Sequence, residues 1–427
     1  MSTVAVHPEI NLDGNLCESE FTLHWVLESL MKKDEVFKNL HGSKILKRFE
    51  AKDISGGKGM FSTVLKIWLH MEDGKNNEEL YTTILKIPGI ESFAAITAEG
   101  KDVEDIKFGG NPLTQSVIQM HDTECHFYEL IAPLISKYVP RVYNTKRWVR
   151  NVHKGCLHME DLSIKGKNMD YFNTLTVPQF KNVINALAFF HSKILSLDQS
   201  QWRGKFISQR NIFSEKADAT KELSCRFIEM VGTGKEELRK LFLNEKIQKI
   251  VFDKDFINYT FFESFQKIGL PILLVHSDLW ASNIMFKTDS EGNFTDEITA
   301  LLDWQCFHEG NWLLDFVRLM SCSLDGDVRR EMEQTIFDFY IRKLTEYMGR
   351  DPGFTANQMK KAYNFVFLAH LDYVTIMPGA IFSARASTGK EFNDVEKARM
   401  DKCVLRAIHA HEDALSLLNS GEFDQWL

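Results

Sequence analysis

The pattern of apolar and polar positions changes along the first part of the chain. Within residues 1–50, a set of apolar side chains recurs at helical spacing: Phe21, Trp25, Leu27, Leu30 and Met31. From Phe61 to His70 the pattern alternates, which predicts a half-buried strand, and Tyr81 to Ile87 predicts a second strand. Because the turn at 71–78 is rich in Gly, Asn and charged residues, we expect these two strands to form an antiparallel hairpin.

The rest of the pattern predicts two lobes of different composition. A helix from His121 to Leu134 and short strands at 139–144 and 155–160 complete a small lobe. Beyond about residue 163 the chain is mostly helical, and Thr176 is a candidate N-cap of one helix. We therefore expect an α+β fold with three parts: an N-terminal helical extension at 1–50, an N-lobe at 51–160 and a C-lobe at 161–427.

Composition narrows the classes of function. With 44% hydrophobic and 26% charged residues, the chain matches a soluble globular protein, and 427 residues suffice for two lobes with a site between them. The formal net charge of -8 provides no basic surface for nucleic acid. The N-terminus shows no signal peptide, and no apolar run approaches the roughly 18 residues of a membrane span. Since the seven cysteines are scattered without CxxC spacing, we expect a cytoplasmic protein without disulfides, zinc, or membrane partners.

The strongest chemical signal is the segment HSDLWASN, from His276 to Asn283, which follows the apolar run ILLV. A second apolar run ends at Asp303, and this spacing suits a hairpin that carries Asp278 and Asp303 to the same edge. Phosphoryl transfer needs a carboxylate that orients the acceptor hydroxyl and oxygen ligands for Mg²⁺. Taken singly, each aspartate could be an ordinary turn or strand-end residue, but together with Asn283 they are candidate catalytic residues, with Asp303 as the main metal ligand. His276 is expected to be a hydrogen-bonded structural residue.

A glycine-rich segment precedes the first predicted strand. Gly56, Gly57, Lys58 and Gly59 would allow the backbone to approach phosphates closely and to direct its N–H groups at them. A dinucleotide-binding site would need a helix after the glycines, whereas a strand is predicted there, and no GxxxxGK[ST] element occurs. The remaining interpretation is a glycine-rich hairpin over nucleotide phosphates, with an ordinary hairpin turn as the alternative.

Lys86 lies among apolar neighbours in the second predicted strand, where its charge would need a partner. Glu124, in the predicted helix that follows, is the candidate, and Glu129 is the alternative. A lysine and glutamate paired between strand and helix would hold the ammonium group on the α and β phosphates. Lys86 could also be an edge-strand lysine whose ammonium group reaches solvent.

Taken in order, these elements resemble the ecdysteroid-kinase-like or CHK-kinase-like family. HSDLWASNIMF and LLDWQ are similar to its two signature motifs, LHMEDLS is similar to its hinge, and HSDLWASN, DWQ and VTIMPGAIFS are most similar to nematode members. The resemblance covers about residues 50–350. The family is related in fold to choline kinases and aminoglycoside phosphotransferases. The resemblance therefore implies a two-lobed protein-kinase-like fold, with a small antiparallel-sheet N-lobe and a larger, mostly helical C-lobe.

The resemblance also implies a role for each motif residue: Asp278 is the catalytic base, Asn283 and Asp303 bind Mg²⁺, and Lys86 pairs with Glu124. At the hinge, backbone groups near Met159, Glu160 and Leu162 would meet the adenine of ATP. Asp315 resembles the structural aspartate that braces the catalytic loop. DWQ in place of DFG, the absence of an APE element, and Ser62 in place of a third glycine suit a small-molecule acceptor rather than a protein.

These signals favour a kinase that uses ATP and Mg²⁺ to phosphorylate a hydroxyl of a small molecule, such as a steroid, a glycoside or another hydroxylated metabolite. A nucleotide-binding pseudokinase or scaffold is an alternative. Choline or aminoglycoside specificity is another, and it would require a strongly acidic acceptor pocket. Trp280, Trp304, Trp312 and the aromatic segment at 362–373 could line an apolar acceptor pocket, although core packing explains them equally well.

Overall fold

The computed structural model describes residues 4–55, 61–73, 75, 77–91, 107–108, 111–170, 172–207, 212–231, 234–386 and 392–427. The chain divides into two compact units: an N-terminal unit of Met1–Ile106 and Pro112–Ile164, and a C-terminal unit of Lys107–Asn111 and Lys165–Leu427. All seven cysteines are free thiols, as predicted. Among the described residues, no helix combines the length and the apolarity that a membrane span requires.

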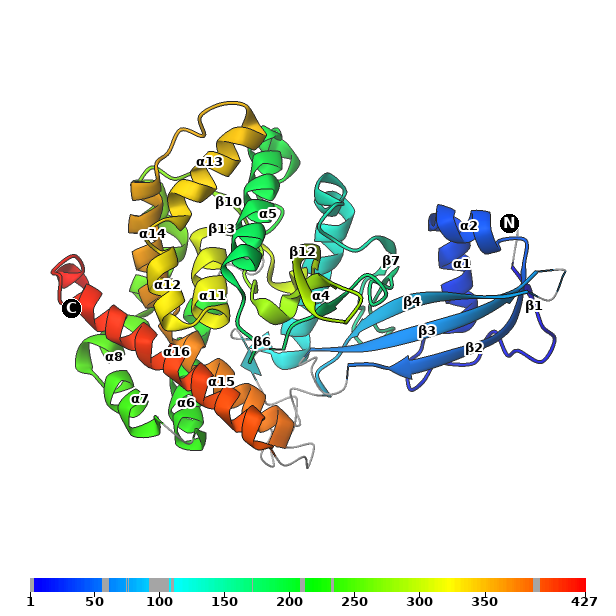
Figure 1. The fold of residues 1–427 in the computed structure, drawn as a ribbon, viewed down its shortest axis with the longest axis horizontal. Helices are drawn as coiled ribbons and strands as arrows, with labels where there is room; N and C mark the ends of the chain where they lie inside the picture. Colours follow the sequence, from blue (N-terminus) through cyan, green and yellow to red (C-terminus); the bar gives the residue numbers. More distant parts are fainter. Residues whose placement is uncertain are drawn as a thin grey trace. The chain divides into compact units, whose positions relative to one another are not determined.

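A six-stranded sheet forms the frame of the N-terminal unit (Figure 1). Its strand order is β1-β2-β3-β4-β8-β7, and all neighbours pair antiparallel except β1 with β2. The strands are β1 (Ala5–Val6), β2 (Ile45–Asp53), β3 (Ser62–Glu72), β4 (Glu78–Pro88), β7 (Val142–Lys146) and β8 (Cys156–Glu160). The predicted antiparallel hairpin is confirmed, because β3 and β4 pair along their whole lengths. The pattern did not predict β2, since Leu46 is its single buried residue and no apolar alternation marks the strand.

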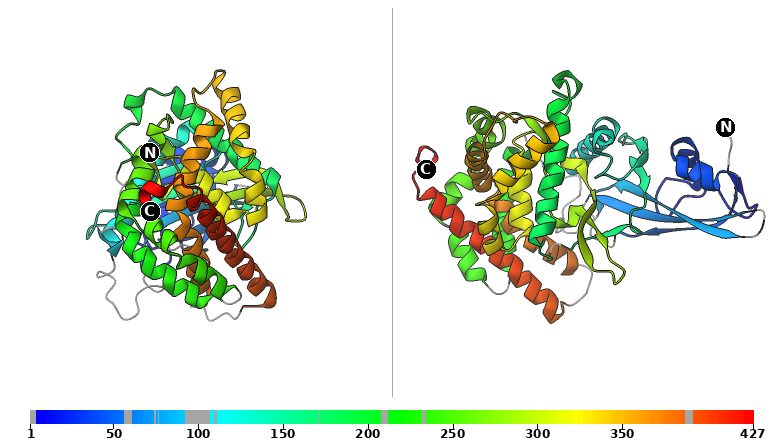
Figure 2. Two further views of the ribbon diagram at one scale, coloured as in Figure 1. Left: turned by 90° about the vertical axis from the view of Figure 1, so that its left-hand side faces the viewer. Right: turned by 45° about the horizontal axis from the view of Figure 1, so that its top comes forward.

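Helices α1 (Leu23–Lys33) and α2 (Glu35–His41) cover one face of this sheet (Figure 1 and Figure 2). Their apolar side chains pack with those of the strands in one cluster, which includes Val26, Leu30, Phe37, Leu65, Ile67, Leu69 and Leu85. Helices α1 and α2 of the predicted N-terminal extension therefore share the core of the sheet. The predicted helix near His121 is α4 (Leu113–Leu130), followed by a short 3₁₀ helix, η2 (Ala132–Ile135).

The C-terminal unit is mostly helical, as predicted. Its longer helices are α5 (Val177–Ser196), α6 (Ile212–Met230), α7 (Lys235–Phe242), α11 (Leu313–Ser323), α13 (Ile336–Met348), α14 (Ala356–Ala369), α15 (Leu371–Ala386) and α16 (Asp394–Leu418). Shorter ones are α8 (Glu245–Val251), α9 (Lys254–Tyr259), α10 (Phe265–Lys267) and α12 (Gly326–Met332). Thr176 caps α5 in a capping box with Gln179, which confirms the predicted N-cap.

Short strands of the C-terminal unit carry the loops of interest. β11 (Ile284–Thr288) pairs with both β9 (Gly166–Asn168) and β12 (Phe294–Leu301), and β10 (Leu273–Val275) pairs with β13 (His308–Gly310). Two further strands, β5 (Lys107–Phe108) and β6 (Asn111–Pro112), make a separate pair. The predicted α+β class, with an antiparallel sheet in the N-terminal unit and a mostly helical C-terminal unit, is confirmed.

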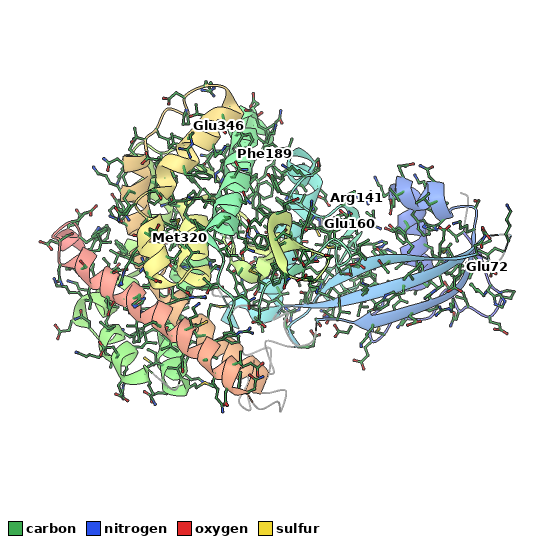
Figure 3. The ribbon with its side chains drawn as sticks, in the orientation of Figure 1. Glu72, Arg141, Glu160, Phe189, Met320 and Glu346 are labelled. Carbon is green, nitrogen blue, oxygen red and sulfur yellow. The ribbon has the colours of Figure 1, made fainter. Side chains whose placement is uncertain are left out.

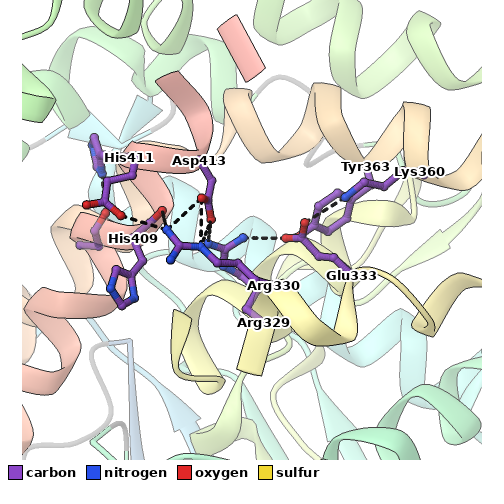
Figure 4. Close-up of polar contacts among 10 residues, drawn as sticks. Arg329, Arg330, Glu333, Lys360, Tyr363, His409, His411 and Asp413 are labelled. Atoms are coloured by element: carbon purple, nitrogen blue, oxygen red, sulfur yellow. Dashed lines mark hydrogen bonds and ion pairs between the residues drawn. The ribbon is translucent and has the colours of Figure 1, made fainter. Parts of the chain in front are cut away.

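Apolar and ionic contacts together hold the helices of the C-terminal unit. Trp304 and Trp312 are fully buried, so core packing explains both. A buried guanidinium, that of Arg329 in α12, pairs with Glu333 at 2.6 Å and with Asp413 of α16 (Figure 4). Glu333 also accepts from Tyr363 of α14 at 2.8 Å, so this network joins three helices.

Candidate active site

The loop between β10 and β11 is anchored by one buried carboxylate. Asp315, in the first turn of α11, accepts the backbone N–H of His276 at 2.9 Å and that of Ser277 at 2.7 Å. Burial raises the pKa of Asp315 to about 7, and the two N–H donors oppose this rise. Ser277 has a φ of 71°, a conformation that a non-glycine residue rarely adopts and that these two bonds hold in place. The bracing contacts expected of Asp315 are therefore present.

His276 links this loop to the end of β12. Its Nε2 donates to the carbonyl of Leu302 at 3.0 Å, while its Nδ1 accepts the N–H of Asp278 at 3.3 Å. Burial lowers the pKa of His276 to about 4, so the ring is neutral at physiological pH. The hydrogen bonds expected of His276 are therefore present.

Asp278 and Asn283 lie together in this loop. The Asn283 Nδ2 donates to the Asp278 carbonyl at 2.8 Å and to its Oδ2 at 3.0 Å. The other carboxylate oxygen, Oδ1, pairs with Arg318 of α11 and accepts the hydroxyl of Tyr373 of α15 at 3.2 Å. Sequence reasoning missed Arg318, and it named Tyr373 only as part of the aromatic segment at 362–373, not as a partner of Asp278. Arg318 follows Asp315 by three positions and so shares its helix face, which is the one signal that could have indicated it.

Asp303 lies beside this loop, just after β12. The N–H of Leu302 donates to the Asn283 carbonyl at 2.8 Å, which ties the end of β12 to the loop. Asp303 itself is left-handed, with φ 65° and ψ 64°, and its Oδ2 accepts a hydrogen bond from Gln305 at 3.4 Å. Non-glycine residues in such conformations concentrate at functional sites.

The oxygens of Asn283 and Asp303 fit Mg²⁺. Both Nδ2 hydrogen bonds of Asn283 point toward Asp278, and its Oδ1 accepts no hydrogen bond from the described residues. Mg²⁺ is usually bound through one or two protein side chains plus substrate phosphates and water. In the described part of the chain, no group of three or more His, Cys, Asp or Glu is placed to hold a metal ion.

In the N-terminal unit, Lys86 of β4 pairs with Glu124 of α4. The Lys86 Nζ lies 2.8 Å and 2.7 Å from the two carboxylate oxygens, and Glu124 is almost fully buried. Glu129, the alternative partner, instead binds Arg147 at 2.6 Å and Thr145 at 2.7 Å. In the structure Lys86 therefore pairs with Glu124, the predicted partner, and not with Glu129, the alternative.

The other residues predicted to bind the nucleotide lie in the glycine-rich segment and in the hinge. Gly56, Gly57, Lys58 and Gly59 lie outside the described residues. On either side of that segment, β2 ends at Asp53 and β3 begins at Ser62, and these two strands pair antiparallel.

The predicted hinge begins at the end of β8. The Met159 carbonyl accepts the Thr83 hydroxyl at 3.0 Å, and Leu162 is buried. Glu160 accepts the Arg141 N–H at 2.8 Å and its guanidinium at 3.3 Å, and the two side chains lie next to each other in Figure 3. The backbone N–H of Glu160 also donates to the Arg141 carbonyl at 2.9 Å, so Arg141 engages both the side chain and the N–H of Glu160.

A second ion pair, which the sequence did not indicate, fixes the hinge from the sheet. The Lys66 Nζ of β3 lies 2.8 Å from a carboxylate oxygen of Asp161 and donates to the Ser163 hydroxyl at 2.7 Å. Asp161 also accepts the N–H of Ser163 at 2.8 Å. The segment after β8 is thereby held in one path.

Together these features define a kinase-like protein: a sheet lysine paired with a helix glutamate in one unit, and an aspartate–asparagine loop beside a second aspartate in the other. The chain belongs to the DUF1679 family, described as "Uncharacterized oxidoreductase dhs-27", whose model matches residues 28–416. The kinase-like resemblance inferred from the motifs is confirmed.

Two curated Caenorhabditis elegans proteins are similar to the chain. "Uncharacterized oxidoreductase dhs-27" is 21% identical over 358 residues, and "Uncharacterized kinase-like protein D1044.1" is 26% identical over 235 residues. These matches cover 82% and 54% of this chain. The chain spans 41% and 57% of the length of those two proteins.

Solved structures similar to the chain include two kinases of small molecules. One is choline kinase from Cryptosporidium parvum, with 12% identity and a TM-score of 0.47 over 89% of this chain and 91% of that chain. Another is an aminoglycoside phosphotransferase from Alicyclobacillus acidocaldarius, with 12% identity and a TM-score of 0.37 over 83% of this chain and 90% of that chain.

Proposed function

We propose that the chain is a phosphotransferase that moves the γ-phosphate of ATP to a hydroxyl of a small molecule. The observation that carries the proposal is the hydrogen-bonded set of Asp278 and Asn283, tied through Leu302 to Asp303. Asp278 would orient the acceptor hydroxyl and take its proton while the hydroxyl oxygen attacks the γ-phosphorus. The bond between that phosphorus and the bridging oxygen then breaks, and ADP leaves.

Both units carry residues that would bind the nucleotide. Asn283 and Asp303 would hold Mg²⁺, which neutralises charge on the phosphates when bound. Lys86, oriented by Glu124, would contact the α and β phosphates, and the backbone at Gly56 to Gly59 would donate N–H groups to them. The backbone from Met159 to Leu162 would meet the adenine.

The surroundings of Asp278 support an acceptor that is not a cation, such as a steroid, a glycoside or another hydroxylated metabolite. The guanidinium of Arg318 already pairs with the carboxylate and offsets its charge. The same guanidinium lies 3.5 Å from the centre of the Tyr373 ring, so this face of the ring is already covered by a cation. These two contacts do not provide the strongly acidic pocket that choline or aminoglycoside specificity would require.

Two other functions remain less supported. A pseudokinase would bind nucleotide without transfer, but this chain carries every residue that the mechanism requires. The oxidoreductase name stands in the description of the family and belongs to a relative of which the chain spans 41%. The glycines here lead into β3, whereas a dinucleotide-binding turn leads into a helix.

Thermal unfolding in ATP with and without Mg²⁺ tests the metal assignment. In wild type, ATP should raise the unfolding temperature further when Mg²⁺ is present, and Asp303→Asn should abolish this further rise. Asparagine can keep the left-handed backbone at this position but lacks the charge that would bind Mg²⁺. Asp289→Asn, in the exposed turn of the same β11–β12 hairpin, is the matched control and should retain it. An unchanged response to Mg²⁺ in Asp303→Asn would show that the metal assignment is wrong.

A further inference from the structure

The two carboxylate oxygens of Asp278 are engaged unequally. Oδ1 receives two donors, the guanidinium of Arg318 and the hydroxyl of Tyr373. Oδ2 receives one, the Nδ2 of Asn283. A carboxylate oxygen can accept about two hydrogen bonds, so Oδ1 accepts as many as it can. The described residues donate only one hydrogen bond to Oδ2, which can therefore accept one more.

Arg318 is itself held from several directions. Its guanidinium is buried, its Nε donates to the His370 Nε2 at 3.0 Å, and it stacks on the ring of Tyr373. A planar guanidinium that is both stacked and hydrogen-bonded keeps one orientation, so it can impose that orientation on a carboxylate. Helix α11 and the first turn of α15 therefore determine together how the Asp278 carboxylate is turned.

We propose that Arg318 and Tyr373 are positioning residues of phosphoryl transfer, which hold Asp278 by Oδ1 so that Oδ2 receives the acceptor hydroxyl. The inference rests on the proposed function, in which Asp278 acts on that hydroxyl. In the step, the hydroxyl oxygen bonds to the γ-phosphorus and its proton passes to Oδ2. The bond from the γ-phosphorus to the bridging oxygen breaks, and its electron pair leaves on ADP.

A purely structural ion pair would behave differently, and the chain offers a matched case. Tyr363 in α14 is buried, and its hydroxyl donates to a carboxylate oxygen of Glu333 at 2.8 Å within the Arg329 network (Figure 4). Tyr363→Phe and Tyr373→Phe remove the same atom from the same kind of bond. If the bond near Asp278 served packing alone, the two changes would have similar consequences.

The test measures steady-state hydrolysis of Mg-ATP by the full chain, with water as the smallest hydroxyl acceptor. Tyr373→Phe keeps the aromatic ring, and we expect the variant to fold. It should lower kcat about tenfold, because it removes one hydrogen bond to a charged group, and it should leave KM for ATP unchanged. Arg318→Met should lower kcat by about a hundredfold or more, and Arg318→Lys should restore part of the loss. Tyr363→Phe should leave kcat unchanged.

The outcomes separate this inference from the proposed function. An active wild-type chain whose Tyr373→Phe and Arg318→Lys variants keep full kcat overturns the positioning role alone. An equal loss in Tyr363→Phe overturns it as well, because packing would then explain the effect. A wild-type chain that neither hydrolyses ATP nor phosphorylates any acceptor overturns the proposed function, and the positioning role with it.

Discussion

Two residues near the candidate base, Ser277 and Asp303, have positive φ values of 71° and 65°. Such conformations cost on the order of 1–3 kcal/mol each and persist where neighbouring groups hold them. Asp315 accepts the backbone N–H groups of Ser277 and of His276 before it, and the His276 ring joins the loop to Leu302 beside Asp303. Asp315 and His276 therefore fix the loop that carries Asp278.

The Lys86–Glu124 pair leads to a prediction at the same scale. Lys86→Met and Glu124→Gln should each weaken ATP binding, and the double variant should lose little more than either single one, because the two residues act as a unit. Calorimetric titration with ATP measures this. Glu129→Gln, which disturbs the neighbouring pair with Arg147, should bind ATP normally. Additive losses would indicate that Lys86 and Glu124 act separately.

Contacts between motif residues could be predicted from the sequence, including the distant pair of Lys86 and Glu124, whereas contacts made by residues outside the motifs could not. The bond from Asn283 to Asp278 spans five positions within one loop. Arg318 and Tyr373 lie 40 and 95 positions from Asp278. Their approach depends on how α11 and α15 pack, which apolar periodicity does not specify.

At the scale of elements, periodicity revealed β3, β4 and α5 because each buries a regular set of apolar side chains. It failed for β2, which is mostly exposed and takes its place in the sheet by pairing with β3. It also did not reveal that α1 and α2 pack on that sheet, since an amphipathic pattern shows which face is apolar but not what covers it.

The ionic network between α12, α14 and α16 gives a prediction about stability (Figure 4). Arg329→Ala should lower the free energy of unfolding by about 3 kcal/mol, because it leaves Glu333 and Asp413 without their buried partner. Arg330→Ala is the control, since Arg330 is partly exposed and its loss should cost about 1 kcal/mol or less. Urea unfolding of both variants measures the difference. If both variants lost the same free energy of unfolding, burial of Arg329 would not explain its contribution.

Across the whole molecule, buried histidines make the fold sensitive to acid. Burial lowers the pKa values of His158 and His191 to about 3 and that of His411 to about 4. The unfolded chain binds protons at these residues near pH 6.5, so their contribution is fully present above that pH and is lost as the pH falls toward the folded values. The free energy of unfolding should therefore drop between pH 6.5 and about 4, by up to about 1.36 kcal/mol per pH unit for each histidine.

Urea unfolding at several pH values checks this slope. His191→Gln should make the pH dependence shallower, because one buried group no longer takes up a proton on unfolding. His24→Gln, at an exposed position, should leave the slope as it is. A slope that both variants share with the wild type would exclude buried histidines as the cause.

The central claim is that Asp278 acts on the acceptor hydroxyl in a phosphoryl transfer from ATP. The most direct measurement incubates the wild-type chain and Asp278→Asn with Mg-ATP and a pool of hydroxylated metabolites, and detects phosphate adducts by mass spectrometry. The wild type should form an adduct, and Asp278→Asn should form it about 10² to 10⁴ times more slowly while binding Mg-ATP within a few-fold of the wild type. An adduct formed by Asp278→Asn at nearly the wild-type rate would contradict the claim.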